Sequence, residues 1–326
     1  MRSTGRKRNE AAVSSVAKTT ALPPALPDHA GLGRWGRIRE SLIHWILFTC
    51  GVLSVLTTVG IVLVLIIESI PFFAHVSLWE FLTSTNWAPT VRPQHFGALP
   101  LINGTALVAI GSGILALPIG LGTAVYLSEY ATPWTRAIIK PMLEILAGIP
   151  SVVYGYFAII FFSPIIRWVF PGTKVFNAAS ACLVVSVMVL PMVISLSEDV
   201  LRGVPRALRD AAYALGANKF DVTTRVVVPA AMSGIMASFL LAISRAIGET
   251  MAVTLAAGAN PRMTLNPLES IQTMTAAIVQ IASGDTPANS PEYRTIFAVG
   301  LALFVMTLGI NIAAQWILAR TRQKYE

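Results

Sequence analysis

The sequence is poor in charged residues. Asp, Glu, Lys and Arg make up only 12% of the 326 residues, whereas 55% are hydrophobic. The charged share is about half that of an average soluble protein. A soluble domain of this length needs more polar surface to cover its core. The composition therefore argues against an ordinary soluble protein and favours a membrane protein.

Residues that support metal, disulfide or ATPase chemistry are also scarce. The two cysteines, Cys50 and Cys182, each lie within an apolar window and form no CxxC pair, so we interpret both as small buried hydrophobes. The four histidines show no HxxxH or HExxH spacing, and no Walker A sequence is present. We therefore expect no metal, no cofactor and no ATPase site within this chain. A membrane-bound enzyme is a distant alternative, because no nucleophile–base set is visible.

The basic charge of the chain follows the pattern of membrane topology. The net charge is +8, but the Lys and Arg residues gather at the ends of apolar windows. Proteins that bind nucleic acid instead carry their basic patch on a folded soluble surface. This distribution predicts a membrane protein that binds no nucleic acid.

Two regions differ in character. Residues 1–42 are polar and basic and contain three helix-breaking prolines, which predicts a flexible cytoplasmic tail. Such a tail serves as a topology signal or binds anionic membrane lipid. Residues 43–326 are predicted to form an all-α transmembrane domain. Its six spans, each long enough to supply the ~20 residues that a bilayer requires, are 45–67, 101–127, 145–166, 175–197, 226–257 and 295–319. The apolar segment 270–284 is short for a span, so we expect an interfacial or re-entrant piece.

The charges at the span ends predict the orientation. One set of ends carries 18 Lys and Arg residues and the other set carries 5, with Arg245 inside a span. Cytoplasmic ends are enriched in Lys and Arg. An even number of spans places both termini on one side, so this count puts both in the cytoplasm.

The loop before the fifth span, 203–229, is predicted to form a compact helical knob. Pro205 suits the first turn of a helix, and Gly216 suits its end. A first helix is expected over 206–215 and a second over 219–224. The small side chains of Ala211 and Ala212 would let another protein pack closely against the first helix.

The fifth span contains two charged residues, Arg245 and Glu249. Their spacing of four places both on one face of a continuous helix. Charges within a bilayer are costly, so both are expected to face the protein interior. The guanidinium of Arg245 suits a tetrahedral oxyanion, and Glu249 could hold Arg245 or accept a hydrogen bond from a protonated oxyanion such as phosphate. The alternative is a structural ion pair that fixes the helix register.

Two segments resemble known permeases. The run Asp210-Ala211-Ala212, Gly216, Val226 and Val228-Pro229 resembles the "EAA" loop of ABC-importer permeases, with the pattern Glu-Ala-Ala-x3-Gly-x9-Ile-x-Leu-Pro. In that family the loop forms a coupling helix that docks in a groove of the ATPase subunit. The resemblance assigns this contact to a set of residues comprising Arg209, Asp210, Ala211, Ala212, Gly216 and Pro229.

The second resemblance lies in the fifth span. The run SRAIGETMAV over 244–253 is similar to the signature of the permease subunits, of the PstC type, in phosphate-specific ABC importers. The similarity covers the chain from about residue 40 onward. It implies the type I (MetI-like) importer fold, with a five-span core and one added amino-terminal span. It also implies a translocation path that includes Ser244, Arg245, Glu249 and Thr250.

The same resemblance implies partners and a location. A second, PstA-like permease would complete the pathway in a bacterial cell membrane, and two ATPase subunits would drive it. An extracytoplasmic binding protein would deliver phosphate. Near the span ends, Glu144 and the Glu198–Asp199 pair are interpreted as interfacial or subunit contacts.

Two other transport functions remain open. One is an ABC permease of the same architecture for another oxyanion, such as molybdate or sulfate. The other is a carrier driven by an ion gradient. Such carriers often contain repeated halves with matched broken helices, and the sequence shows no convincing repeat.

Overall fold

The computed structural model describes residues 34–287 and 290–321, and it separates into two units, residues 1–61 and 62–326. Most of the predicted tail, 1–33, lies outside the described residues, as do 322–326. Residues 34–42 are not a flexible tail as predicted, because they form the first turns of the long helix α2 (Arg34–Phe73).

The first unit, where it is described, is the amino-terminal part of α2. Three of its hydroxyl groups bond within the helix: those of Thr49, Thr57 and Thr58 donate to carbonyl oxygens four residues earlier. Such internal bonding suits a lipid environment, where no water is available. Cys50 is exposed on this helix, so our interpretation of it as buried was wrong, whereas Cys182 is buried as expected.

The second unit contains the remaining helices and one short hairpin, in which Trp87 pairs with Phe96 and Ala88 with His95. Three π-helical turns, 126–130, 158–162 and 223–227, join some of the helices. After the end of α2, the elements in chain order are α3 (Leu78–Thr83), β1 (Trp87–Ala88), β2 (His95–Phe96), α4 (Leu99–Val125), α5 (Pro133–Gly148), α6 (Ser151–Phe157), α7 (Ser163–Val169), α8 (Ala178–Gly203), α9 (Arg206–Ala214), α10 (Lys219–Val222), α11 (Val228–Gly248), α12 (Met251–Ala257), α13 (Met274–Ala282) and α14 (Pro291–Thr321).

Six helical stretches in the described residues are long and apolar enough to cross a membrane, which confirms the predicted number. They are Arg39–Phe73, Leu99–Tyr130, Ser151–Val169, Ala178–Gly203, Lys219–Gly248 and Pro291–Trp316. The segment 270–284 forms only the nine-residue helix α13, which is too short to span a bilayer.

The third span differs from the prediction at its start. Residues 133–148 form the separate helix α5, and Ser151 begins the next helix after Ile149 and Pro150. The hydroxyl of Thr132 accepts the backbone N–H of Thr135 at 3.2 Å, and Pro133 occupies the first turn. These are standard start signals for a helix. The predicted third span begins only at 145, so the prediction missed this helix.

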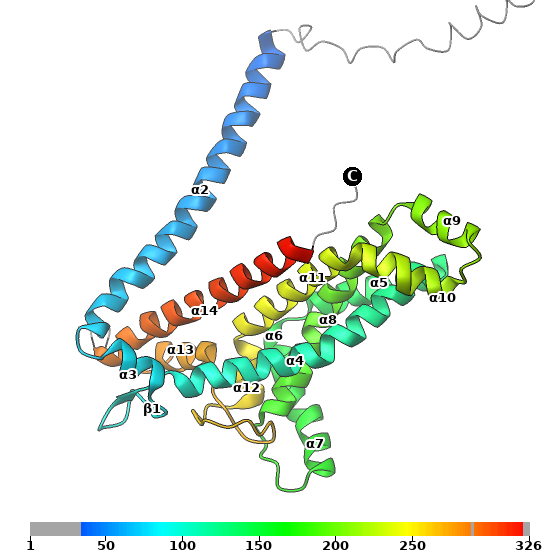
Figure 1. Cartoon of the computed structure of the whole chain (residues 1–326). Coiled ribbons are helices and arrows are strands. Elements are labelled where there is room, and N and C mark those ends of the chain that lie inside the picture. Colours follow the sequence, from blue (N-terminus) through cyan, green and yellow to red (C-terminus); the bar gives the residue numbers. More distant parts are fainter. Residues whose placement is uncertain (1–33, 288–289, 322–326) are drawn as a thin grey trace, which may run out of the picture. The chain divides into compact units, whose positions relative to one another are not determined.

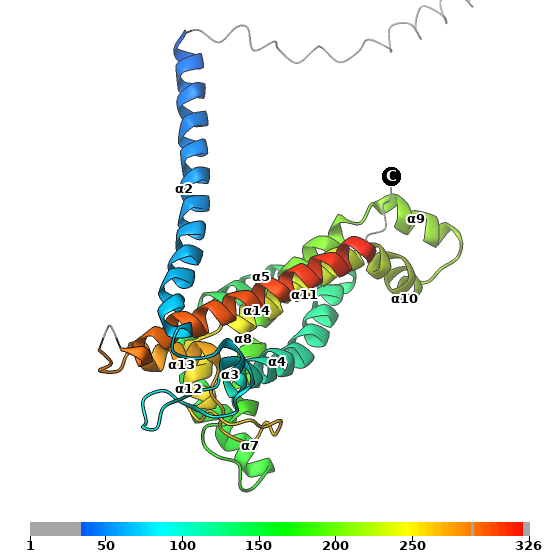
Figure 2. The ribbon, with the colours of Figure 1, turned by 60° about the vertical axis from the view of Figure 1, so that its left-hand side comes forward.

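Helix α8 lies at the centre of the second unit and packs against α4 and α11. The glycines of α4 permit this approach: a Cβ on Gly120 would lie 2.6 Å from Cγ1 of Val193. Helices α11 and α14 run side by side, as both views show (Figures 1 and 2). Helices α9 and α10 lie at one end of this unit, here called the α9 end, and α3 and α13 lie at the opposite end (Figures 1 and 2).

Candidate functional site

The fifth span is broken at Glu249. Helix α11 ends at Gly248, Glu249 has extended backbone angles (φ −68°, ψ 130°), and α12 begins at Met251. Because Glu249 is outside the helix, the predicted shared face with Arg245 does not form, and the predicted continuous helix over 226–257 was wrong. Gly248 is a poor helix former and provides a natural stopping point.

The carboxylate of Glu249 stabilises the break. Its Oε1 accepts the backbone N–H of Ala252 at 3.3 Å, which satisfies one of the free donors in the first turn of α12. A negative group is also favourable at the positive end of a helix. The backbone carbonyl of Glu249 accepts the hydroxyl of Thr275 at 2.9 Å, which ties the break to α13. The hydroxyl of Thr250 donates to the carbonyl of Gly248 at 3.1 Å.

Arg245 lies in the last turn of α11 and is exposed. Within residues 34–287 and 290–321, no hydrogen bond or ion pair holds its guanidinium, and Glu249 does not pair with it. The preceding residue, Ser244, donates to Oδ1 of Asn311 in α14 at 2.7 Å. Asn311 was not predicted as a site residue, although an amide in a largely apolar helix is a recognisable signal for a contact between helices.

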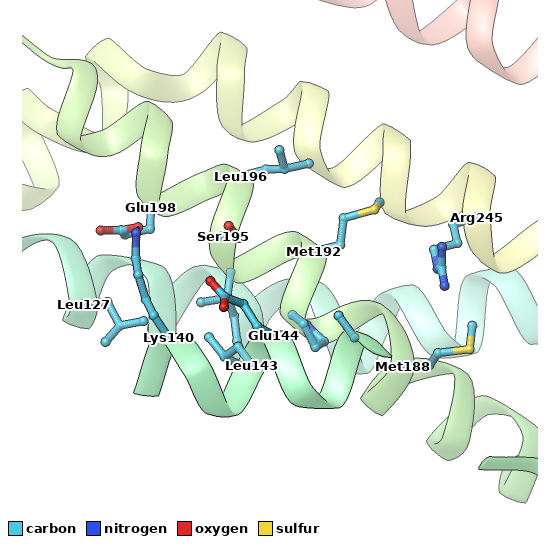
Figure 3. Close-up of a pocket in the computed structure, with 13 residues that line it drawn as sticks. Leu127, Lys140, Leu143, Glu144, Met188, Met192, Ser195, Leu196, Glu198 and Arg245 are labelled. Atoms are coloured by element: carbon cyan, nitrogen blue, oxygen red, sulfur yellow. The ribbon is translucent and has the colours of Figure 1, made fainter. Parts of the chain in front are cut away.

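Arg245 borders a cavity of about 390 Å³ between α5, α8 and α11. Figure 3 shows Arg245 toward one end of this cavity, Lys140 and Glu198 at the other, and Glu144 between them. The cavity is lined by Leu127, Lys140, Leu143, Glu144, Ala147, Met188, Pro191, Met192, Ile194, Ser195, Leu196, Glu198 and Arg245.

Glu144 and Glu198 are the two carboxylates that line this cavity together with Arg245, whereas Glu249 does not line it. Glu144 is exposed and projects from α5. Its position near a span end predicted an interfacial or subunit contact, and the structure shows that it lines the cavity. The cavity thus combines a free guanidinium with a carboxylate from a different element.

Glu198 is fully buried and is surrounded by three cations of the same chain. Its oxygens lie 2.6 Å from Nζ of Lys140, 3.4 Å from Nε of Arg136 and 3.5 Å from Nη1 of Arg202. Burial of a lone carboxylate is costly, so these cations are needed to offset its desolvation. Our interpretation of Glu198 as an interfacial or subunit contact does not fit this burial, because its partners lie within the same chain. Asp199 is exposed and lies 3.8 Å from Lys140.

The predicted helical knob is present as α9 and α10, and Gly216 ends the first helix with φ +84°. Arg209 of α9 pairs with Glu129 at 3.1 Å and donates to the carbonyl of Leu201 at 2.8 Å. Lys219 lies 4.7 Å from the ring centre of Tyr130. The knob is thereby attached to the ends of both α4 and α8.

One face of the knob is exposed. Asp210 and Ala211 are exposed, Ala212 is half-buried, and Pro229 lies in the first turn of α11. Large apolar side chains are exposed beside them, including Leu215 at 90% and Phe220 at 67%. Exposed apolar surface of this kind is typical of a protein-binding site.

Comparisons with known proteins agree with this architecture. A family model described as "Binding-protein-dependent transport system inner membrane component" matches residues 116–324. The chain is 33% identical to the "Probable ABC transporter permease protein YqgH" of Bacillus subtilis, over 85% of this chain and 90% of that protein. It is 34% identical to the "Phosphate transport system permease protein PstC" of Mesorhizobium japonicum, over 74% of this chain and 79% of that protein.

A solved structure is similar in fold. It is the crystal structure of a bacterial ABC transporter involved in the import of the acidic polysaccharide alginate, and the similarity has a TM-score of 0.62 at 13% identity. The match covers 89% of this chain and 99% of that one.

Proposed function

This chain belongs to the family of binding-protein-dependent transport system inner membrane components, and from that premise we propose that it is the permease subunit of an ATP-driven importer of inorganic phosphate. It is a multi-pass membrane protein with the MetI-like importer fold. In this proposal it forms half of the translocation pathway, and a second, PstA-like permease forms the other half.

One observation carries the choice of an anionic solute: the unpaired guanidinium of Arg245 borders a cavity between apolar helices. An ionised side chain in such a place is costly and is a marker of function in membrane proteins. The planar donors of a guanidinium fit two oxygens of a tetrahedral oxyanion. The similarity to phosphate transport permeases favours phosphate among these anions.

The free carboxylate of Glu144 adds a reason to favour phosphate. Phosphate carries a proton near neutral pH and can donate a hydrogen bond to a carboxylate, whereas sulfate carries none. In our proposal Arg245 binds the anion, and Ser244, Glu249 and Thr250 hold the broken helix around it. Ser244 and Glu249 do so through their contacts with Asn311 and with α12 and α13.

The α9 end is the proposed ATPase-docking end. An ATPase subunit would bind the exposed face of α9. The contacts of Arg209 with Glu129 and Leu201 would then transmit its movement to the helices that line the cavity. The charge bias of the sequence supports an orientation with this end and both termini in the cytoplasm. A phosphate-binding protein would then approach the opposite side of the bacterial cell membrane.

The solute can be tested with the complete transporter in proteoliposomes. ATP hydrolysis should rise when the binding protein is supplied with phosphate, but not when it is supplied with sulfate or molybdate. Stimulation by sulfate or molybdate instead would assign the chain to another oxyanion importer. Uptake by this chain alone, driven by an ion gradient without ATP, would replace the proposal with a secondary carrier.

A further inference from the structure

We propose that Lys140 is a second anion-binding residue, at the α9 end of the cavity, which receives the phosphate after it leaves Arg245. This inference rests on the proposed function, because it assigns a further step to the same path. In the proposed orientation the α9 end faces the cytoplasm, so Lys140 would act last, immediately before release.

The position of Lys140 in the cavity is the first reason. Among the residues that line the cavity, Arg245 and Lys140 are the two cations, and Figure 3 shows them toward opposite ends. Much of the wall between them is apolar, with side chains such as Leu143, Met188 and Met192. An anion that leaves Arg245 along this wall loses its counter-charge, which is costly in an apolar environment. Lys140 is the next group in the cavity that can supply one.

The charge balance around Lys140 is the second reason. The cluster contains three cations, Arg136, Lys140 and Arg202, and two carboxylates, Glu198 and Asp199. It therefore carries one excess positive charge. An incoming phosphate monoanion would neutralise that excess. Glu198 would keep Arg136 and Arg202 as partners while Lys140 turns toward the anion.

The geometry of these contacts is the third reason. Neither carboxylate oxygen of Glu198 has a well-aligned hydrogen bond, and the buried Nε of Arg136 has none either. The side chain of Lys140 is 35% exposed, although its Nζ lies 2.6 Å from Glu198. The ammonium is thus held by a close contact with one carboxylate while its side chain remains partly exposed, so it can turn toward an anion in the cavity.

The cluster is also connected to the knob. Arg209 of α9 donates to the carbonyl of Leu201, which lies three residues after Glu198 on α8. Arg136 donates to the carbonyl of Leu127 and, at 3.4 Å, to that of Ser128, next to the Glu129 partner of Arg209. Movement of α9 would thus shift both helices that position Lys140 and Glu198, and it would time release with ATP hydrolysis.

A matched pair of variants separates anion binding from neutralisation of Glu198. Lys140 and Arg202 both pair with Glu198, but only Lys140 lines the cavity. In proteoliposomes with the complete transporter and phosphate-loaded binding protein, Lys140→Gln should lower phosphate uptake about tenfold, as expected for the loss of a charge-assisted contact. ATP hydrolysis should stay within about twofold of wild type, so phosphate carried per ATP falls. Lys140→Arg should restore most uptake, and Arg202→Gln should leave uptake within about twofold.

The double variant Lys140→Gln/Glu198→Gln guards against a folding defect, because it removes one charge of each sign and leaves the net charge of the cluster unchanged. It should assemble normally and still transport slowly. Recovery of uptake in the double variant, equal loss in Lys140→Gln and Arg202→Gln, or unchanged uptake in Lys140→Gln would each overturn the role of Lys140. None of these outcomes contradicts the proposed function, which is tested separately by the identity of the solute, the need for ATP and the Arg245→Ala variant.

Discussion

Arg245 and Glu249 have separate roles in the structure, although they lie only four residues apart. Arg245 remains in α11 and borders the cavity, whereas Glu249 leaves the helix and caps α12. A spacing of four predicts a shared face only while the helix continues. The sequence therefore indicates two costly charges in a span, but it does not reveal that one of them is used to start a new helix.

The capping role of Glu249 predicts a graded response to substitution. Glu249→Ala removes the acceptor for the N–H of Ala252 and should lower the stability of the permease by about 1 kcal/mol, as for other helix caps. Glu249→Gln keeps an acceptor oxygen and should lose less. Thermal unfolding of the purified complex, followed by tryptophan fluorescence, measures the difference. An unfolding temperature for Glu249→Ala equal to that of wild type would argue against the cap.

Helix α9 shows how far local sequence signals determine an element. Pro205 and Gly216 mark its two ends as predicted, because proline suits a first turn and glycine accepts a positive φ without strain. Its attachment to Glu129 could not be predicted, since that residue lies 80 positions earlier and nothing local links it to Arg209. Long-range pairing of this kind requires the packed structure.

Gly216 provides a test of the knob as a coupling element. A Cβ would meet nothing within 4 Å at either Gly216 or Gly203, but only Gly216 has a positive φ, of +84°. Gly216→Ala should therefore strain the end of α9 by on the order of 1 kcal/mol, shift the docking face and reduce phosphate-stimulated ATP hydrolysis. Gly203→Ala is the matched control and should hydrolyse ATP normally. Equal activity in the two variants would count against a coupling role for α9.

At the scale of the whole molecule, the number of spans followed from hydropathy, because length and apolarity alone identify a membrane helix. The importer fold was implied by the resemblance to known permeases. The sequence did not predict the cavity. Its walls come from α5, α8 and α11, and α5 was mistaken for a loop. The burial of Glu198 was missed for the same reason, since two of its cations, Arg136 and Lys140, project from α5.

In the proposed mechanism, Arg245 is the free cation of this cavity and binds the transported anion. The decisive measurement is phosphate uptake in cells that lack all other phosphate transporters, with Arg245→Ala compared to wild type and to Arg262→Ala. Arg262 is an exposed loop residue outside the cavity and serves as the control for loss of a basic side chain. We predict that Arg245→Ala assembles at wild-type levels but takes up no phosphate, while Arg262→Ala transports normally. Normal phosphate uptake by the assembled Arg245→Ala transporter would contradict the claim.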